Sequence, residues 1–193
     1  MCCILLCRHD KERHTVKEKR IGSATVRLLQ GDITACEVDA VINVTGKTLV
    51  SYDEEDAPVP VQLDPKIWED HDGEHPVVLT SADDIRAHHI LNAPIVETTS
   101  TSGANKIRKT MRRILEEAQQ NQLKTLAVPA IGSGVNRYPI ERCAEILLEE
   151  LSRSVHQANN SIEKVIFVLQ SQKSYRIFEQ VLDDYIEAER AKD

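Results

Sequence analysis

Polar and glycine residues follow two apolar segments of the chain, at the points where each segment ends. Val38 to Val44 is a mostly apolar run with Asn43 near its end, and Leu126 to Ile131 runs directly into Gly132-Ser133-Gly134. Apolar, β-branched runs of this length predict buried strands. In open α/β sheets, ligands bind outside the carboxyl ends of the strands. The two loops therefore predict a cleft for a phosphate-bearing ligand.

The loop at Gly132 has residue types that suit a diphosphate. Glycines let backbone N–H groups approach phosphate oxygens closely, and the helix expected after Pro139 would present its positive end. Alone, the tripeptide is a weak signal, because such loops also contain glycine for backbone reasons. Asp32 follows another strand-like segment. Its carboxylate could cap the turn that leads into Thr34, or it could accept a hydrogen bond from an exocyclic amine such as that of adenine.

The residue pattern gives less support to metal binding and to nucleophilic catalysis. The sequence has no HExxH motif, and His71 and His75 lie in an acidic stretch. We therefore predict no metal and no cofactor. No histidine is spaced to activate Ser133, so we predict no nucleophile, base and orienter set.

Length, charge and cysteine content limit the number of domains, the kinds of partner and the compartment that we expect. The 193 residues fit one domain, which we place at residues 22–190 after an N-terminal extension, Cys-rich then basic, at residues 1–21. The net charge of −7 argues against a general nucleic-acid binder, and we expect no sequence-specific nucleic-acid partner. Five cysteines without a regular spacing favour a reducing compartment, so we expect an intracellular protein of the cytoplasm or nucleus.

No apolar run is long enough to predict a transmembrane segment. Cys2, Cys3 and Cys7 stand in an apolar start that precedes a basic stretch. This arrangement would suit S-acylation combined with attraction to anionic lipids, hence a weak membrane association. The alternative is a frayed or locally packed N-terminus.

Periodicity predicts the order of the elements. Alternating or apolar segments predict strands, and three- and four-residue spacing predicts helices. A short helix is also expected within the irregular, acidic residues 47–75, at residues 65–69. The second half alternates helix and strand, which indicates parallel strands with helices packed on both faces, and the early strands could add antiparallel edges. The expected strands are 24–29, 38–44, 76–80, 89–96, 125–131 and 165–169, and the expected long helices are 103–120, 140–155 and 174–189.

The first long helix has a basic face opposite its apolar one. The simplest interpretation is solvated surface, and the alternative is a weak contact with a polyanion or an acidic partner. The face consists of Lys106, Arg108, Lys109, Arg112 and Arg113.

In order and spacing, three blocks resemble the macro domain, an α/β module that binds ADP-ribose. They are residues 28–34, 38–43 and 126–134, and the resemblance covers roughly residues 22–187. It implies a three-layer α/β/α sandwich with a mixed, largely parallel central sheet. The loop from Gly132 and the segment 165–169 are most similar to macro-histone and macro-domain-containing polymerase modules.

The resemblance also implies roles for residues. Asp32 would bond the adenine amine, with the Ile33 backbone N–H nearby, and Asn43 would lie beside the distal ribose. Asn136 occupies the place where many members put an aromatic residue against that ribose. The diphosphate would be wrapped by the backbone amides of Gly132, Ser133, Gly134 and Val135.

The chain departs from family hydrolases at two places. After Asn43 it continues Val-Thr-Gly-Lys and then an acidic run at residues 53–56, where the hydrolases continue Ala-Ala-Asn and a glycine run. Gln170 stands where an adenine-stacking aromatic is expected. We therefore expect a non-catalytic, weak reader module for ADP-ribose or ADP-ribosylated protein.

Two alternatives stay open. The first is an ADP-ribosyl hydrolase, acting in protein de-ADP-ribosylation or O-acetyl-ADP-ribose deacetylation, in which Asn43 positions a water and an acid from residues 53–56 assists. The second is a ligand-silent macro fold that serves as a protein-interaction scaffold.

Overall fold

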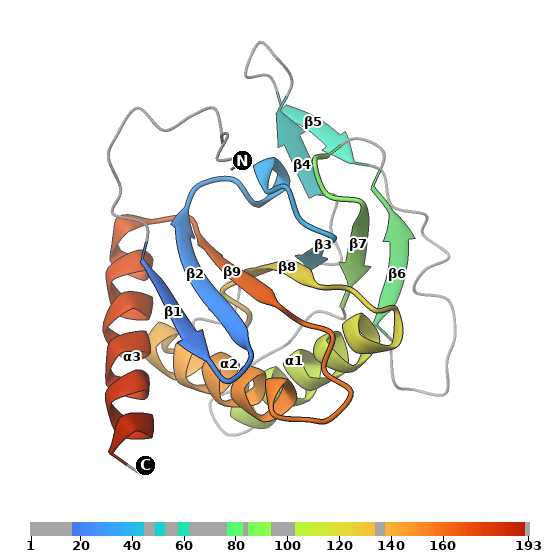
Figure 1. Ribbon diagram of the computed structural model, residues 1–193. Coiled ribbons are helices and arrows are strands. Elements are labelled where there is room, and N and C mark those ends of the chain that lie inside the picture. Colours follow the sequence, from blue (N-terminus) through green and yellow to red (C-terminus); the bar gives the residue numbers. More distant parts are fainter. Residues whose placement is uncertain are drawn as a thin grey trace, which may run out of the picture.

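A computed structural model describes residues 17–44, 49–52, 58–61, 77–82, 85–93, 103–133 and 138–191 (Figure 1). For residues 49–52 and 58–61 it describes the backbone alone. The predicted short helix at residues 65–69 and the acidic run at residues 53–56 lie outside the described residues.

A seven-stranded mixed sheet forms the centre of the molecule (Figure 1). The five inner strands run parallel, and the two outermost strands are each antiparallel to their neighbour. A separate antiparallel hairpin joins β4 (Leu49–Tyr52) and β5 (Pro58–Val61). In spatial order the sheet consists of β1 (Glu18–Ile21), β2 (Ala24–Gln30), β9 (Lys164–Leu169), β8 (Thr125–Pro129), β3 (Ala40–Asn43), β7 (His89–Asn92) and β6 (Val78–Ser81).

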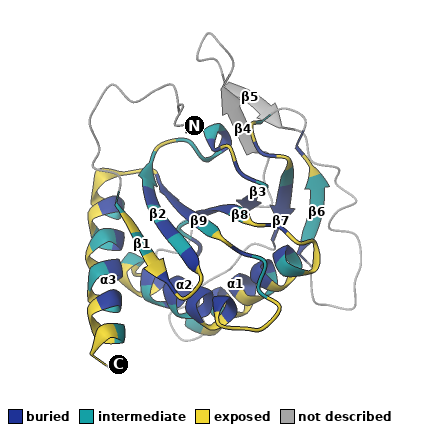
Figure 2. Cartoon of the chain, viewed as in Figure 1, coloured by how far each residue is buried: buried dark blue, intermediate teal, exposed yellow. Residues whose placement is uncertain are grey.

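One face of the central strands packs against three helices, α1 (Gly103–Gln120), α2 (Ile140–Val155) and α3 (Gln172–Arg190). Along β9, Val165, Phe167 and Leu169 join this core because alternate side chains of a strand share a face. The ring centroids of Phe167 and Phe178 lie 5.6 Å apart, which locks α3 to the sheet. Figure 2 shows the buried residues along the central strands and on the inner sides of the helices.

The other face of the sheet carries a smaller apolar cluster. Ile166 and Val168 of β9 and Val41 of β3 point to it. In the described part of the chain this cluster is covered by the 3₁₀ turn η1 (Ile33–Ala35) and by the loop at Ile85 to Ala87. By alternation along β3 and β7, Asn43 and Asn92 also belong to this face. The face opposite the α-helices is therefore the one that leads to the predicted site.

The predicted α/β class with a mixed, largely parallel sheet is confirmed. Helices on both faces were also predicted, but among the described residues α1, α2 and α3 all pack on one face, and the other face carries the turn η1. The helices at 103–120 and 140–155 have the predicted bounds. β7 ends at Asn92, before Pro94, and lies inside the sheet because β6 pairs along its outer side. β1 was not predicted. It lies before residue 22, so the sheet begins within the segment assigned to the N-terminal extension.

Candidate ligand site at the carboxyl edge of the sheet

The two predicted ligand loops leave neighbouring strands at the same edge of the sheet. β3 and β8 are hydrogen-bonded parallel neighbours, so Asn43 at the end of β3 lies beside the turn that follows Pro129 of β8 (Figure 1). Asp32 follows β2, three strand positions from β3 in the sheet order. Three spacings amount to about 14 Å. A ligand that contacts Asp32 and Asn43 must therefore cross the ends of β9 and β8.

Asp32 is held by the turn that it caps. Its Oδ1 accepts a hydrogen bond from the backbone N–H of Thr34 at 2.9 Å, and its Oδ2 accepts one from the Thr34 hydroxyl at 2.7 Å. Gly31 N–H donates to the Leu169 carbonyl at 3.1 Å, which fixes the start of the turn against β9. The capping role is thus present. Each carboxylate oxygen has a second lone pair, so a further donor can still be accepted.

Ile33 lies in η1 and packs, half-buried, against the cluster on the second face. Its carbonyl accepts a hydrogen bond from Cys36 N–H at 3.2 Å, which closes the turn. The position of the Ile33 backbone is therefore set by the same turn that Asp32 caps.

Gly132 is required by close packing. Its backbone has a φ of +88°, a value that residues other than glycine rarely adopt. A methyl group there would lie 2.4 Å from Cδ1 of Ile107 and 3.5 Å from Sγ of Cys143. Burial raises the pKa of the Cys143 thiol to about 12, so this cysteine is a packed side chain and not a nucleophile. The glycine therefore has a backbone reason as well as its proposed role toward phosphate.

Ser133 closes the same turn. Its backbone N–H donates to the Ala130 carbonyl at 3.3 Å, and its hydroxyl donates to that carbonyl at 2.8 Å. A diphosphate contact through this N–H would have to replace a bond within the turn. The other predicted residues of this loop, Gly134, Val135 and Asn136, lie outside the described residues.

Asn43 is buried, with 2% of its surface exposed, and its side-chain amide forms a hydrogen bond to the neighbouring strand β7. Asn43 Nδ2 donates to Oδ1 of Asn92 at 3.0 Å. Asn92 is fully buried, and its Nδ2 donates to the Thr80 hydroxyl at 3.1 Å. Sequence reasoning missed Asn92. The sequence feature that could have revealed it is that two strands, Ala-Val-Ile-Asn and His-Ile-Leu-Asn, both end on asparagine. These strands pair in register.

The opposite edge of the sheet carries an open cavity of about 450 Å³, lined by polar residues and one valine. Its central group, the Asp39 carboxylate, accepts hydrogen bonds from the backbone N–H groups of Lys124 and Thr125 at 2.7 and 2.8 Å. Burial acts to raise the pKa of Asp39, but these hydrogen bonds outweigh it and lower the pKa. Asp39 therefore joins the starts of β3 and β8. The lining consists of Glu37, Val38, Asp39, Arg86, His88 and Thr125.

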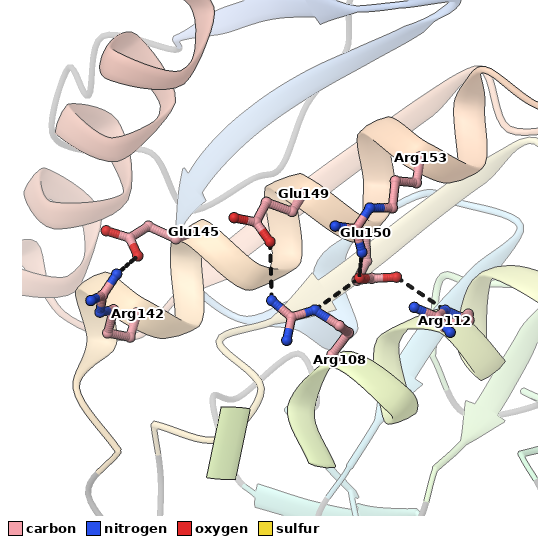
Figure 3. Close-up of polar contacts among 7 residues, drawn as sticks. All are labelled: Arg108, Arg112, Arg142, Glu145, Glu149, Glu150 and Arg153. Atoms are coloured by element: carbon pink, nitrogen blue, oxygen red, sulfur yellow. Dashed lines mark hydrogen bonds and ion pairs between the residues drawn. The ribbon is translucent and has the colours of Figure 1, made fainter. Parts of the chain in front are cut away.

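Part of the basic face of α1 is paired with α2 (Figure 3). Glu150 is buried, with 2% of its side chain exposed. Its Oε1 lies 3.1 Å from Nε of Arg108, its Oε2 lies 3.2 Å from Nε of Arg112, and Arg153 contacts it from within α2. Glu149 adds a second contact to Arg108. These arginines join two helices, so they are not the plain solvated surface that the sequence suggested.

Among the described residues, no group of three or more His, Cys, Asp or Glu is placed to hold a metal ion. No helix in this part of the chain is long and apolar enough to cross a bilayer. Cys2, Cys3 and Cys7 lie outside the described residues.

Known proteins resemble this chain in sequence and in fold. The model of the Macro domain family matches residues 71–147. A macro domain-containing protein of Caldanaerobacter subterraneus is 27% identical over 170 residues, which cover 82% of this chain and 96% of that protein. An O-acetyl-ADP-ribose deacetylase of Klebsiella pneumoniae is 26% identical over 169 residues, with 82% and 96% covered.

A solved mutant macrodomain of Oceanobacillus iheyensis with ADPR shares the fold. Its TM-score is 0.68 at 23% identity, over 89% of this chain and 99% of that chain. The family model, the relatives and the architecture all point to macro domains. In sequence and in fold, the chain is similar to macro domain proteins.

Proposed function

We propose that the protein binds ADP-ribose, free or attached to protein, at the carboxyl edge of its sheet. The observation that carries this proposal is the adjacency of the β3 and β8 ends, with Asp32 on the same edge about 14 Å away. An extended nucleotide sugar has adenine and a distal ribose at its two ends and a diphosphate between them. The macrodomain of Oceanobacillus iheyensis that was solved with ADPR supports the choice of ligand.

In this proposal each part of the ligand meets one element. Adenine lies over the end of β2, where the Asp32 carboxylate accepts from the exocyclic amine and Ile33 offers its backbone nearby. The distal ribose lies at Asn43, and the resemblance assigns Asn136 to the same ribose. The diphosphate lies between them, against the backbone of Gly132, Ser133, Gly134 and Val135. The family model covers this last loop but neither Asp32 nor Asn43. These two assignments depend on the resemblance of residues 28–34 and 38–43 and on their place at the carboxyl edge of the sheet.

The proposed binding is weak and non-catalytic. Gln170 is exposed at the end of β9, directly after the residue that bonds to Gly31. Because an amide side chain replaces an aromatic ring there, binding loses on the order of 1–3 kcal/mol of stacking free energy with adenine. Gly46 replaces the second asparagine of the hydrolases, and their glycine run is missing. The chain therefore lacks the backbone donors that this run would bring to the phosphates.

Hydrolysis is the second candidate function. It is favoured by one comparison, the similarity to the O-acetyl-ADP-ribose deacetylase of Klebsiella pneumoniae. In that case Asn43 would position the attacking water. The test is turnover of O-acetyl-ADP-ribose or of mono-ADP-ribosylated protein. Turnover that disappears in Asn43→Ala would show that the protein is a hydrolase and not a non-catalytic binding module.

We also propose that the protein acts inside the cell, in the cytoplasm or nucleus, on ADP-ribosylated proteins. Cys36 and Cys143 are buried and are not in a disulfide, which supports a reducing compartment. A weak membrane association through Cys2, Cys3 and Cys7 is a separate proposal. Palmitate labelling of the intact protein, lost when all three are replaced by serine, would support it.

Calorimetric titration with ADP-ribose tests the binding proposal. We expect measurable heat from the wild-type protein. Asp32→Ser keeps a side chain that can cap η1 but removes the carboxylate, so affinity should fall about 10- to 100-fold, as expected for a hydrogen bond to a charged group. Asp184→Ser is the matched control, because it makes the same charge change at an exposed position of α3. Absence of heat at millimolar ADP-ribose would favour the ligand-silent scaffold.

A further inference from the structure

A chain of side-chain hydrogen bonds crosses three strands on the sheet face opposite the α-helices. Asn43 of β3 donates to Asn92 of β7 at 3.0 Å, and Asn92 donates to Thr80 of β6 at 3.1 Å. The Thr80 hydroxyl donates in turn to the Ile90 carbonyl at 3.4 Å. Asn43 is 2% and Asn92 0% exposed, so water cannot easily replace these bonds.

The hydrogen bonds at Thr80 and at the neighbouring carbonyls fix which way each group in this series donates. Asn92 Nδ2 also lies 3.4 Å from the carbonyls of Val78 and Ile90, which can only accept. The Thr80 hydroxyl has one proton, which it gives to a carbonyl, so it accepts from Asn92. Oδ1 of Asn92 must therefore face Asn43. Reversing the Asn92 amide would set two N–H groups against each other in a buried place.

The orientation of Asn43 follows from that of Asn92. Its Nδ2 is turned toward β7, where it donates to Asn92. The amide is thus held at the carboxyl edge of the sheet, where we place the distal ribose.

We propose that Asn92, held by Thr80, is a positioning residue that fixes the Asn43 amide and thereby sets the preference for ADP-ribose over ADP. This inference rests on the proposed function. ADP shares the adenine, the proximal ribose and the diphosphate but has no distal ribose. A group that acts only through Asn43 must therefore affect ADP-ribose and spare ADP.

The test compares the affinities of the two nucleotides across five proteins by calorimetry. In Asn92→Leu, which removes the acceptor at similar volume, we expect the affinity ratio of ADP-ribose to ADP to fall about three- to tenfold, the effect of one hydrogen bond. The affinity for ADP should stay within about twofold. Asn43→Ala should lower the ratio by a similar factor, and combining it with Asn92→Leu should lower it no further.

Ile90→Val is the matched control, because it removes buried volume on the same face of the same strand and leaves the amides in place. Its ratio should equal that of the wild type. An Asn92→Leu protein that loses both nucleotides equally, or neither, overturns the proposal.

If the wild type binds neither nucleotide, the binding function fails and the positioning role is judged by NMR. Exchange of the Asn43 side-chain amide protons should be faster in Asn92→Leu than in Ile90→Val. Equal exchange would overturn the role of Asn92.

Discussion

At Gly132 the backbone has a φ of +88° and lies against Ile107 of α1, so there is no room for a Cβ. Substituting alanine should strain the backbone and overpack the helix contact. We expect Gly132→Ala to lower the free energy of unfolding by about 2–5 kcal/mol, the sum of the two costs. Denaturant unfolding measures it.

The control for this prediction is the Gly132→Ala, Ile107→Val double variant. Valine lacks Cδ1, the atom nearest to the added methyl group. The double variant should therefore lose less stability than the two single effects add up to. A Gly132→Ala protein as stable as the wild type would show that the loop can move away from α1.

Residue types at strand ends allow Asn43, Asp32 and Gly132 to be proposed as site residues from the sequence. The bonds that these residues make could not be found there. Asn92 becomes visible only when β3 and β7 are paired in register, which brings together residues 49 positions apart. Ser133 was predicted as a phosphate donor, and its bond to Ala130 depends on the turn geometry.

At the scale of elements, the contact between α1 and α2 depends on a buried carboxylate. Glu150 is paired with Arg108 and Arg112 of α1 and with Arg153 of α2 (Figure 3). Glu150→Gln removes the charge at almost unchanged volume. We expect it to lower the free energy of unfolding by about 1–2 kcal/mol, since the bonds are charge-assisted but the arginines are partly exposed.

Glu145→Gln serves as the matched variant. Glu145 pairs with Arg142 on the surface of the same helix, where the two side chains are 41% and 66% exposed. Such an exposed pair contributes little to stability, so Glu145→Gln should change the free energy of unfolding less than Glu150→Gln does. Equal effects of the two substitutions in thermal or denaturant unfolding would mean that the Glu150 cluster does not hold the helices together.

Local periodicity predicts the helices better than it predicts the strands. α1 and α2 begin and end where the three- and four-residue spacing does. β1, Glu18 to Ile21, buries only its last residue, so it has no apolar alternation to find. It is kept in place by pairing with β2 and by ion pairs from Lys17 and Lys19 to Asp183 of α3. These long-range contacts do not show in a local pattern.

At the scale of the whole molecule, the sheet has two edges that could hold a ligand. The carboxyl edge has Asp32, Asn43 and the turn at Gly132, and the opposite edge has the open cavity of about 450 Å³ around Asp39. The Asp39 carboxylate is committed to backbone N–H groups of Lys124 and Thr125, so that edge is tied by structural bonds. The α/β topology therefore favours the carboxyl edge.

The location of ADP-ribose on the sheet is the most direct test of this account. Two-dimensional ¹H–¹⁵N NMR of the full chain during a titration with ADP-ribose would give it. We expect the largest shift changes at Gly31 to Ala35, at Asn43 and at Ala130 to Ser133, and little change at Val38, Asp39 and His88. Changes centred on Asp39 and His88, or no changes at millimolar ligand, would contradict the proposed site.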